Sequence, residues 1–334
     1  MQATIYGCKG LELSEAEARF FRDSDPWGFI LFARNIETPD QVRGLCAALR
    51  ETAGHNVPIL VDQEGGRVAR LRPPHWIAYP PARRYGALYA QDREAGLEAC
   101  RLGALLIGLD LAVIGIDVNC IPLADVPQPG AHDIIGDRAY GEEAETVAAL
   151  ARAAAEGLGA AGVLPVLKHI PGHGRATADS HEALPVVEAS ADELRAVDFA
   201  PFKSLSDLPL GMTAHVVYAA LDRDHPATTS PDVVRVIREE IGFQGLLMTD
   251  DVSMKALGGT IAERVRESFA AGCDVILHCN GDMAEMEAVA SAASDLTVDA
   301  FARSELALSR RKTPVGQSLE VIRARWMDLL GASA

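Results

Sequence analysis

The chain has 334 residues, of which 49% are hydrophobic, so it is long enough to bury a sizeable core. Its formal net charge is -16 at pH 7. An acidic chain without a basic stripe is poorly suited to neutralising phosphate groups, so neither a nucleic acid nor an anionic membrane surface is an expected partner. No basic segment with a long apolar run opens the chain, and aspartates interrupt the apolar segment 105–126, which predicts neither a signal peptide nor a membrane span.

The cysteines are widely spaced and none forms a C-x-x-C pair. They are Cys8, Cys46, Cys100, Cys120, Cys273 and Cys279. This distribution is typical of free, buried thiols in a reducing compartment rather than of a disulfide framework or a zinc site. We therefore expect a cytoplasmic protein, and we expect it to be a monomer.

Short apolar runs alternate with longer amphipathic or alanine-rich segments along the chain. The runs predicted as strands are 3–6, 28–32, 58–62, 117–121, 164–168, 210–214, 246–250 and 274–278. They read as continuous runs of Val, Ile and Leu, which is expected of parallel strands that are covered on both faces.

Capping residues in the sequence indicate where several helices begin. A hydroxyl residue followed by proline, at 38–39 and at 230–231, is typical of an N-cap with proline at the first helical position. The segment 190–193 reads Ser-Ala-Asp-Glu and matches a capping box. The alanine-rich run 142–161 has high helix propensity.

Eight strands alternating with helices predict an α/β protein with a (β/α)8 barrel of the TIM type, forming a single domain over residues 1–334. A doubly wound sheet is the rival architecture. It would place a glycine-rich phosphate turn after an early strand, and residues 7–10 do not form a G-x-G-x-x-G motif.

Polar side chains follow five of the predicted strands at the point where each strand ends. They are Asp62, Lys168 with His169, His215, Asp250 with Asp251, and His278. The carboxyl ends of the strands of an α/β barrel converge on one face, and the active site lies there. The sequence therefore predicts a functional rim.

A metal-dependent hydrolase is one interpretation of this rim. His169 and His173 have the i, i+4 spacing of a helical zinc pair. Pro171, Gly172 and Gly174 lie within the same segment, however, and disfavour a helix there. We expect no metal and no other cofactor.

Glycoside hydrolysis is a second interpretation. Asp250 could act as a nucleophile if cations such as Lys168 or Arg138 keep it ionised. His181 could donate and accept a proton near neutrality, and Asp179, two residues earlier, could orient its ring. The spacing of Asp179 and His181 also fits an ordinary solvated loop.

A barrel that binds sugar without turning it over is the third interpretation, because Asp62, Arg138 and Lys168 could simply hydrogen-bond hydroxyl groups. Composition does not separate these three possibilities.

Five sequence blocks, which follow one another along the chain, favour one of these three interpretations. They are GFILFARN at 28–35, VDQEGGRV at 61–68, IGDR at 135–138, KHIPGHG at 168–174 with DSH at 179–181, and GFQGLLMTDDVSM at 242–254. With these blocks the chain resembles the bacterial β-N-acetylhexosaminidases of glycoside hydrolase family 3, of the single-domain cytoplasmic type used in cell-wall recycling. Thr249, Val252, Ala139 and Ile170 depart from the residues usual in that family, without touching an expected catalytic group.

The resemblance implies a retaining mechanism without a metal. Asp250 corresponds to the nucleophile, His181 to the general acid/base and Asp179 to its orienting partner. The residues implied to hold the N-acetylglucosamine ring are Asp62, Arg70, Arg138, Lys168 and His169. The implied substrates are small carbohydrates, namely peptidoglycan fragments in which terminal N-acetylglucosamine is joined to anhydro-N-acetylmuramyl peptides.

Other residues near these motifs receive structural interpretations. Asp251 is expected to make structural hydrogen bonds, and His278 and Cys279 are expected to be structural. His215 could lie in the substrate site or behind it. Gly172 and Gly174 are expected to give the loop that follows Lys168 freedom to move.

Overall fold

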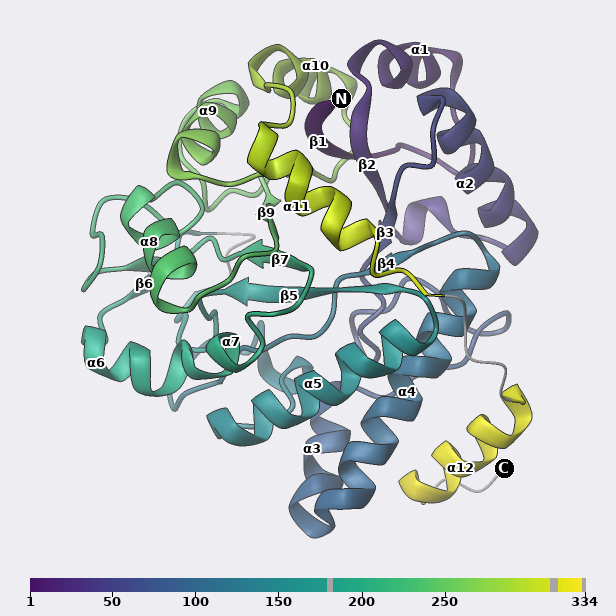
Figure 1. The fold of residues 1–334 in the computed structure, drawn as a ribbon, viewed down its shortest axis with the longest axis vertical. Coiled ribbons are helices and arrows are strands. Elements are labelled where there is room, and N and C mark those ends of the chain that lie inside the picture. Colours follow the sequence, from purple (N-terminus) through teal and green to yellow (C-terminus); the bar gives the residue numbers. More distant parts are fainter. Residues whose placement is uncertain (179–182, 313–317, 332–334) are drawn as a thin grey trace.

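In the computed structural model, which describes residues 1–178, 183–312 and 318–331, eight parallel strands close into a barrel with the order β1-β10-β9-β7-β5-β4-β3-β2 (Figure 1). The barrel strands are β1 (Gln2–Gly7), β2 (Pro26–Leu31), β3 (Ile59–Val61), β4 (Val118–Asn119), β5 (Leu164–Ile170), β7 (Leu210–Thr213), β9 (Leu246–Asp251) and β10 (Val275–His278). Each overlaps one of the eight predicted runs, so the predicted (β/α)8 barrel is confirmed.

A small second sheet escaped prediction. It pairs β6 (Val186–Val187) with β8 (Val217–Tyr218) in parallel. Two residues are too few to show the alternation or apolar run by which a strand is recognised in a sequence.

The helices lie around the barrel. They are α1 (Glu15–Ser24), α2 (Pro39–Ala53), α3 (Ala82–Gln91), α4 (Arg93–Val113), α5 (Ala144–Ala160), α6 (Ala191–Glu193), α7 (Ala200–Ser204), α8 (Pro231–Arg235), α9 (Ile261–Ala271), α10 (Met283–Ala292), α11 (Val298–Leu308) and α12 (Leu319–Leu330). Short 3₁₀ or π turns are η1 (Ala33–Asn35), η2 (Gly136–Arg138), η3 (Leu194–Asp198) and η4 (Val236–Glu240).

The predicted helix starts are confirmed. Thr38 and Ser230 cap α2 and α8 with proline in the first turn, and Ser190 and Glu193 form the capping box of α6. The alanine-rich run forms α5.

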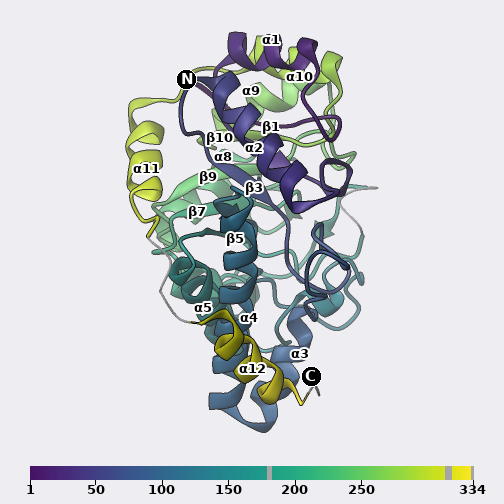
Figure 2. The same cartoon turned by 90° about the vertical axis from the view of Figure 1, so that its right-hand side faces the viewer.

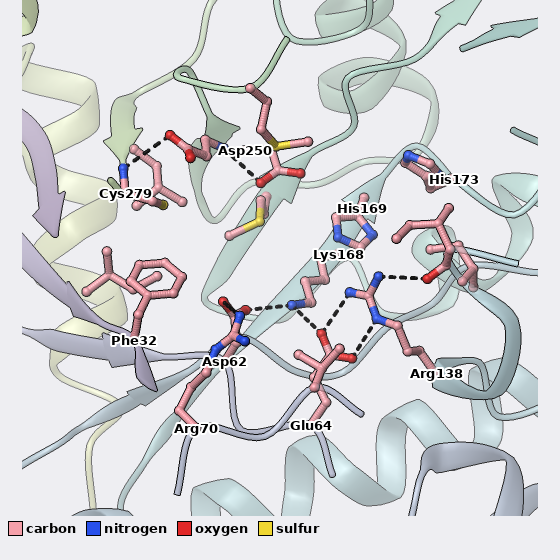
Figure 3. A pocket seen from close by; sticks show the side chains of 18 of the residues that line it. Phe32, Asp62, Glu64, Arg70, Arg138, Lys168, His169, His173, Asp250 and Cys279 are labelled. Carbon is pink, nitrogen blue, oxygen red and sulfur yellow. Dashed lines mark hydrogen bonds and ion pairs between the residues drawn. The ribbon is translucent and has the colours of Figure 1, made fainter. Parts of the chain in front are cut away.

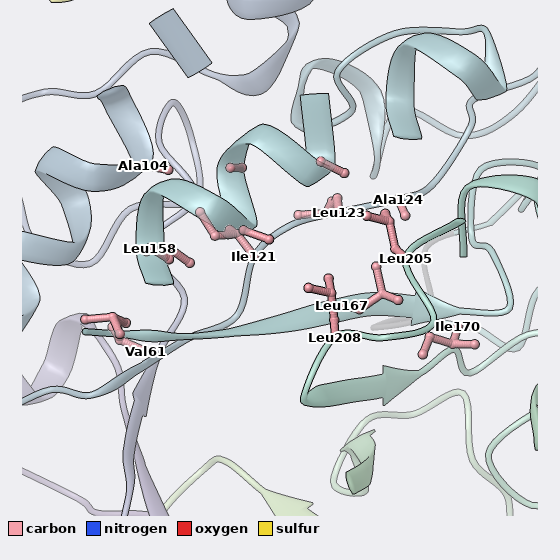
Figure 4. Packing of buried hydrophobic residues seen from close by; sticks show 14 of the residues in the cluster. Val61, Ala104, Ile121, Leu123, Ala124, Leu158, Leu167, Ile170, Leu205 and Leu208 are labelled. Carbon is pink, nitrogen blue, oxygen red and sulfur yellow. The ribbon is translucent and has the colours of Figure 1, made fainter. Parts of the chain in front are cut away.

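The strand residues are buried on both faces, as their apolar composition predicted. Leu60 and Val166 belong to the cluster inside the barrel, whereas Ile59 and Leu167, their neighbours in sequence, pack outward toward the helices. Figure 4 shows the outer layer, in which Leu167 of β5 lies with other apolar side chains between strand and helices. Side chains of each strand alternate between the barrel interior and the helix layer, so a one-residue shift in register would exchange the two sets.

Two further helices lie outside the regular alternation. Helix α11 contributes Ala300 and Ala307 to the inner cluster, and Ser304 accepts a hydrogen bond of 2.6 Å from Nε1 of Trp27 at the start of β2, so α11 closes the amino end of the barrel. Helix α12 lies beside α3 and α4 in both views (Figures 1 and 2). No helix in residues 1–178, 183–312 or 318–331 is both long and apolar enough to cross a membrane.

Candidate active site

A cavity of about 340 Å³ opens at the carboxyl ends of the strands (Figure 3). The predicted site residues that line it are Asp62, Arg70, Arg138, Lys168, His169 and Asp250. They come from separate parts of the sequence, after β3, from η2, and from the ends of β5 and β9. Asp179 and His181 lie outside the described residues.

One wall of the cavity is a network of carboxylates and cations. Nζ of Lys168 lies 2.8 Å from Oδ1 of Asp62 and 2.7 Å from Oε1 of Glu64. Arg138 donates two hydrogen bonds of 2.8 Å to the two carboxylate oxygens of Glu64. Arg70 donates one of 3.3 Å to Asp62. The charges alternate in space, so each one holds its neighbours in a fixed geometry.

Every member of this network with a shifted pKa is shifted toward its charged form. Burial by itself raises the pKa of Asp62 and of Glu64, but the adjacent cations outweigh it and the net pKa of each is lowered. Burial lowers the pKa of Lys168 and of Arg138, and their carboxylate partners raise both above the usual values. The cavity therefore presents fixed charges to a ligand at neutral pH.

Glu64 is a site residue that the sequence interpretation missed. Its side chain is only 5% exposed and it bridges Lys168 and Arg138. A signal was present, because Glu64 follows a strand end by three residues within a polar, glycine-rich run. Lys168 or Arg138 was expected to keep Asp250 ionised; Lys168 does lower the pKa of Asp250, whereas Arg138 is paired with Glu64.

His169 is held by a buried aspartate that was not predicted. Oδ2 of Asp125 lies 2.8 Å from Nδ1 of His169, and Oδ1 accepts the backbone N–H groups of His169 and His173. Burial raises the pKa of Asp125, but the imidazole of His169 outweighs it and the pKa falls to about 2. An ionised Asp125 accepts a hydrogen from Nδ1, which leaves Nε2 as the ring nitrogen available to a ligand.

Asp250 is different from the other carboxylates. Its Oδ1 accepts a hydrogen bond of 2.8 Å from the backbone N–H of Asp251. Within the described part of the chain it forms no direct ion pair, whereas Asp62 and Glu64 do. Burial raises its pKa, but His215, His169 and the Asp251 N–H outweigh burial and lower it. Asp250 is therefore an ionised carboxylate that forms no direct ion pair with any residue that the structure describes.

The neighbours of Asp250 keep the end of β9 in place. Oδ1 of Asp251 accepts the backbone N–H groups of Ser253 and Cys279, and its Oδ2 accepts the Ser253 hydroxyl. Asp251 thus makes the structural hydrogen bonds that we expected. Cys279 was expected to be structural, but the structure places it in the wall of the cavity.

Glycines shape the segment after Lys168 by allowing close contacts. Gly172 has a φ of 138°, which favours glycine, and its carbonyl accepts a hydrogen bond of 2.6 Å from the Tyr218 hydroxyl. A Cβ atom at Gly174 would lie 2.1 Å from the carbonyl oxygen of Val126. Both glycines are packed against neighbouring residues here, and the expected movement of the loop stays a prediction.

Metal ligation was the alternative interpretation of the histidines. The rings of His169 and His173 lie 5.6 Å apart, centroid to centroid, and Nδ1 of His169 is already paired with Asp125. Over residues 1–178, 183–312 and 318–331, no three His, Cys, Asp or Glu side chains are grouped so that they could hold a metal ion.

A closed α/β barrel whose strand ends carry an ionised carboxylate beside a charged, hydrogen-bonding wall has the features of an enzyme active site, which lies at this face in α/β barrels. The model of the glycosyl hydrolase family 3 N-terminal domain matches residues 10–308. The chain belongs to glycoside hydrolase family 3, and its activity is that of a beta-N-acetylhexosaminidase. The predicted family and enzyme class are confirmed, and a barrel that only binds sugar is set aside.

Individual relatives agree with this assignment. A beta-hexosaminidase from Aromatoleum aromaticum is 34% identical over 316 residues, which cover 93% of this chain and 88% of the relative. One from Xanthomonas axonopodis pv. citri is 36% identical over 285 residues, 84% of each protein. The crystal structure of NagZ from Neisseria gonorrhoeae in complex with N-trifluoroacetyl-D-glucosamine has a TM-score of 0.88 at 30% identity, covering 99% of this chain and 97% of that one.

Proposed function

We propose that the protein is a retaining hydrolase in which Asp250 attacks the anomeric carbon and forms a glycosyl-enzyme. The observation that carries this proposal is the state of Asp250, a carboxylate in the lining of the cavity that is held in its ionised form and has no direct ion pair within the described residues. A nucleophile needs an available lone pair, and a direct ion pair would compete for it. The cation network lies on the opposite wall, where it can hold the substrate instead (Figure 3).

We assign sugar binding to Asp62, Arg70, Arg138, Lys168 and His169. Charged groups with fixed positions form strong, directional hydrogen bonds to hydroxyl groups and exclude misplaced ligands. Within the described residues Nε of Arg70 is buried without a hydrogen-bond partner, so it offers a donor to a ligand. Glu64 joins this set as the residue that positions Lys168 and Arg138.

The proton donor is assigned to His181, with Asp179 orienting its ring, because the motif around both residues matches the family. A general acid matters most when the leaving group is poor. We expect His181→Ala to lose on the order of 10³-fold in kcat/KM on an unactivated N-acetylglucosaminide, and much less on an activated aryl glycoside. Equal losses on both substrates would contradict the assignment.

We infer that the substrates are small peptidoglycan fragments that end in N-acetylglucosamine. The inference is supported by the N-acylated glucosamine held by the Neisseria protein and by the family motifs. The six cysteines are buried and unpaired, which fits action in the reducing cytoplasm. Release of N-acetylglucosamine from purified anhydromuropeptides, compared with chitobiose at equal concentration, tests the preference; a preference for chitobiose would contradict it.

The decisive experiment on the mechanism is covalent trapping. A fluorinated N-acetylglucosamine donor that forms the glycosyl-enzyme and hydrolyses slowly should label the protein, and peptide mass spectrometry should place the label on Asp250. Proton NMR of early turnover should show the β-anomer first, because two displacements retain configuration. A label elsewhere, or the α-anomer first, would overturn the proposal.

A further inference from the structure

A chain of buried polar side chains lies behind the nucleophile, outside the cavity lining. Thr213 ends β7, His215 follows it, and Thr228 comes from the connection to α8; each of the three is 0% exposed. Polar groups that leave water must recover their hydrogen bonds inside the protein, so these three side chains are expected to bond to one another or to the backbone.

The chain runs from β7 to the residue after the nucleophile. Nδ1 of His215 lies 2.7 Å from the Thr228 hydroxyl, which also lies 2.8 Å from the Thr213 hydroxyl and 3.1 Å from the carbonyl oxygen of Ala214. Nε2 of His215 lies 3.0 Å from the carbonyl oxygen of Asp251. The backbone N–H of Asp251 in turn binds the carboxylate of Asp250.

Counting hydrogens restricts the states of this chain. The carbonyl of Asp251 can only accept, so Nε2 of His215 must carry a hydrogen. If the ring is neutral, Nδ1 accepts the single hydroxyl hydrogen of Thr228. If the ring is charged, Nδ1 donates to Thr228, and the Thr228 hydroxyl turns to the carbonyl of Ala214. In both states Thr213 can donate to Thr228, so rotation of one hydroxyl accommodates the second proton.

When its ring is protonated, His215 also acts on Asp250 through its charge. Among the charged neighbours that lower the pKa of Asp250, His215 contributes most, followed by His169, with Lys168 contributing less. Among the described residues, the titratable groups that interact electrostatically with His215 are Asp250 and Asp251 on β9 and His169 on β5. Burial lowers the pKa of His215, and the two aspartates partly offset that effect.

We propose that His215 is a positioning residue for Asp250 whose second proton is accommodated by the Thr228 hydroxyl. It holds the carbonyl group of Asp251, the residue whose backbone N–H binds the Asp250 carboxylate, and on acidification it takes up a positive charge that favours the ionised form of Asp250. The proposal rests on the proposed role of Asp250 as nucleophile. It assigns to Thr228, which does not line the cavity, an effect on the pH dependence of the reaction.

Thr228→Val and Thr228→Ser form a matched pair to test this. Valine keeps the shape of threonine but offers no acceptor to a protonated Nδ1, so the charged ring is disfavoured and Asp250 loses a neighbouring positive charge. The carboxylate then protonates at higher pH. We expect the acid limb of kcat/KM to move upward by about one pH unit in Thr228→Val. Thr228→Ser keeps the hydroxyl and should keep the wild-type limb.

The outcomes separate this inference from the proposed function. Fluoro-sugar labelling of Thr228→Val at neutral pH should still modify Asp250. An unshifted acid limb with the label on Asp250 overturns the role of Thr228 alone, as does an equal loss of activity at every pH. A label on another residue overturns the nucleophile assignment and this inference with it.

A direct measurement does not depend on how well the valine variant folds. In wild-type enzyme labelled with ¹⁵N in its histidines, the His215 ring should be a neutral Nε2–H tautomer at pH 8. Its Nδ1 signal should shift to that of a protonated nitrogen on acidification while Asp250 is still ionised. A ring that stays neutral until Asp250 protonates would overturn the proposal.

Discussion

The two ends of the barrel both carry buried carboxylates, but they use them differently. At the amino end, Asp274 before β10 accepts the backbone N–H of Leu247 and pairs with Arg238 and Arg303. Asp117 before β4 repeats the pattern, accepting the N–H of Ile59 and pairing with Arg50 and Arg311. Each carboxylate there is closed in by two arginines and a neighbouring strand.

At the carboxyl end the carboxylates are not fully enclosed by arginines and strands. Asp62, Glu64 and Lys168 form ion pairs, but they line a cavity of about 340 Å³. Asp250 has a backbone N–H and no direct ion pair among the described residues. Charge alone therefore does not identify a site in this barrel. The distinguishing feature is charge that the protein itself leaves open to a ligand.

Asp250→Asn should separate activity from stability most strongly. The amide keeps the shape and can still accept the N–H of Asp251, but it is not a nucleophile. We expect kcat/KM on an aryl N-acetylglucosaminide to fall on the order of 10⁴-fold. The free energy of unfolding in urea should change by less than about 1 kcal/mol. A variant that keeps activity would show that the open carboxylate is not the nucleophile.

Asp274→Asn is the counterpart at the amino end. It leaves Arg238 and Arg303 without their carboxylate in a largely buried setting, so we expect a loss of about 3 kcal/mol in the free energy of unfolding. At a temperature where the variant is folded, kcat should equal that of the wild type. A large fall in kcat of the folded variant would contradict the claim that carboxylates at the amino end serve stability alone.

Glu64→Gln tests whether the ion pairs at the carboxyl end serve the ligand. The amide cannot hold both Lys168 and Arg138 as strongly as the carboxylate does, so both donors lose their fixed positions. We expect kcat/KM to fall about 10²-fold, which corresponds to about 2.7 kcal/mol. Binding of N-acetylglucosamine, measured by calorimetry, should weaken as well. Unchanged binding would assign Glu64 to stability, like Asp274.

Asp198→Asn has the smallest expected effect and concerns pH. Burial raises the pKa of Asp198 to about 6, although Arg175 opposes it at 2.7 Å. The folded state then binds the proton more tightly than the unfolded chain, so this residue makes the protein less stable as pH rises from about 4 to about 6. The asparagine variant lacks that contribution.

The measurement is urea unfolding of both proteins at pH 4.5 and pH 7. The difference in unfolding free energy should move in favour of Asp198→Asn by about 2 kcal/mol between the two pH values. Asp222→Asn is the control, because hydrogen bonds outweigh burial and lower the pKa of Asp222, so this carboxylate is ionised in the folded and unfolded states over this range and its variant should show almost no change with pH. Parallel behaviour of the two variants would contradict the assignment for Asp198.

Much of the architecture was readable in the sequence because its signals are local. The eight barrel strands were found as apolar runs, since parallel strands bury both faces. The starts of α2, α6 and α8 were found from their capping residues. The two-residue strands β6 and β8 carry no periodic signal, and they were missed.

The residues of the candidate site also fall into those with a local sequence signal and those without one. Asp62, Lys168 and Asp250 were recognisable because each ends an apolar run, and topology then brings such ends together. Asp179 and His181 lie outside the described residues, so their roles stay predictions. Glu64 and Asp125 were missed, because their importance lies in what they touch: Glu64 bridges two cations, and Asp125 fixes a histidine from 44 residues away.

The sequence by itself determined the barrel, its strand ends and the titratable residues placed there, because burial pattern and chain order are local properties. The tertiary structure decided how those charges are paired. It paired Asp62 and Glu64 with cations, left Asp250 without an ion pair among the described residues, and placed His215 in contact with Thr228 and Asp251. Pairing depends on distances of a few ångströms between distant segments, because electrostatic and hydrogen-bond energies fall steeply with separation.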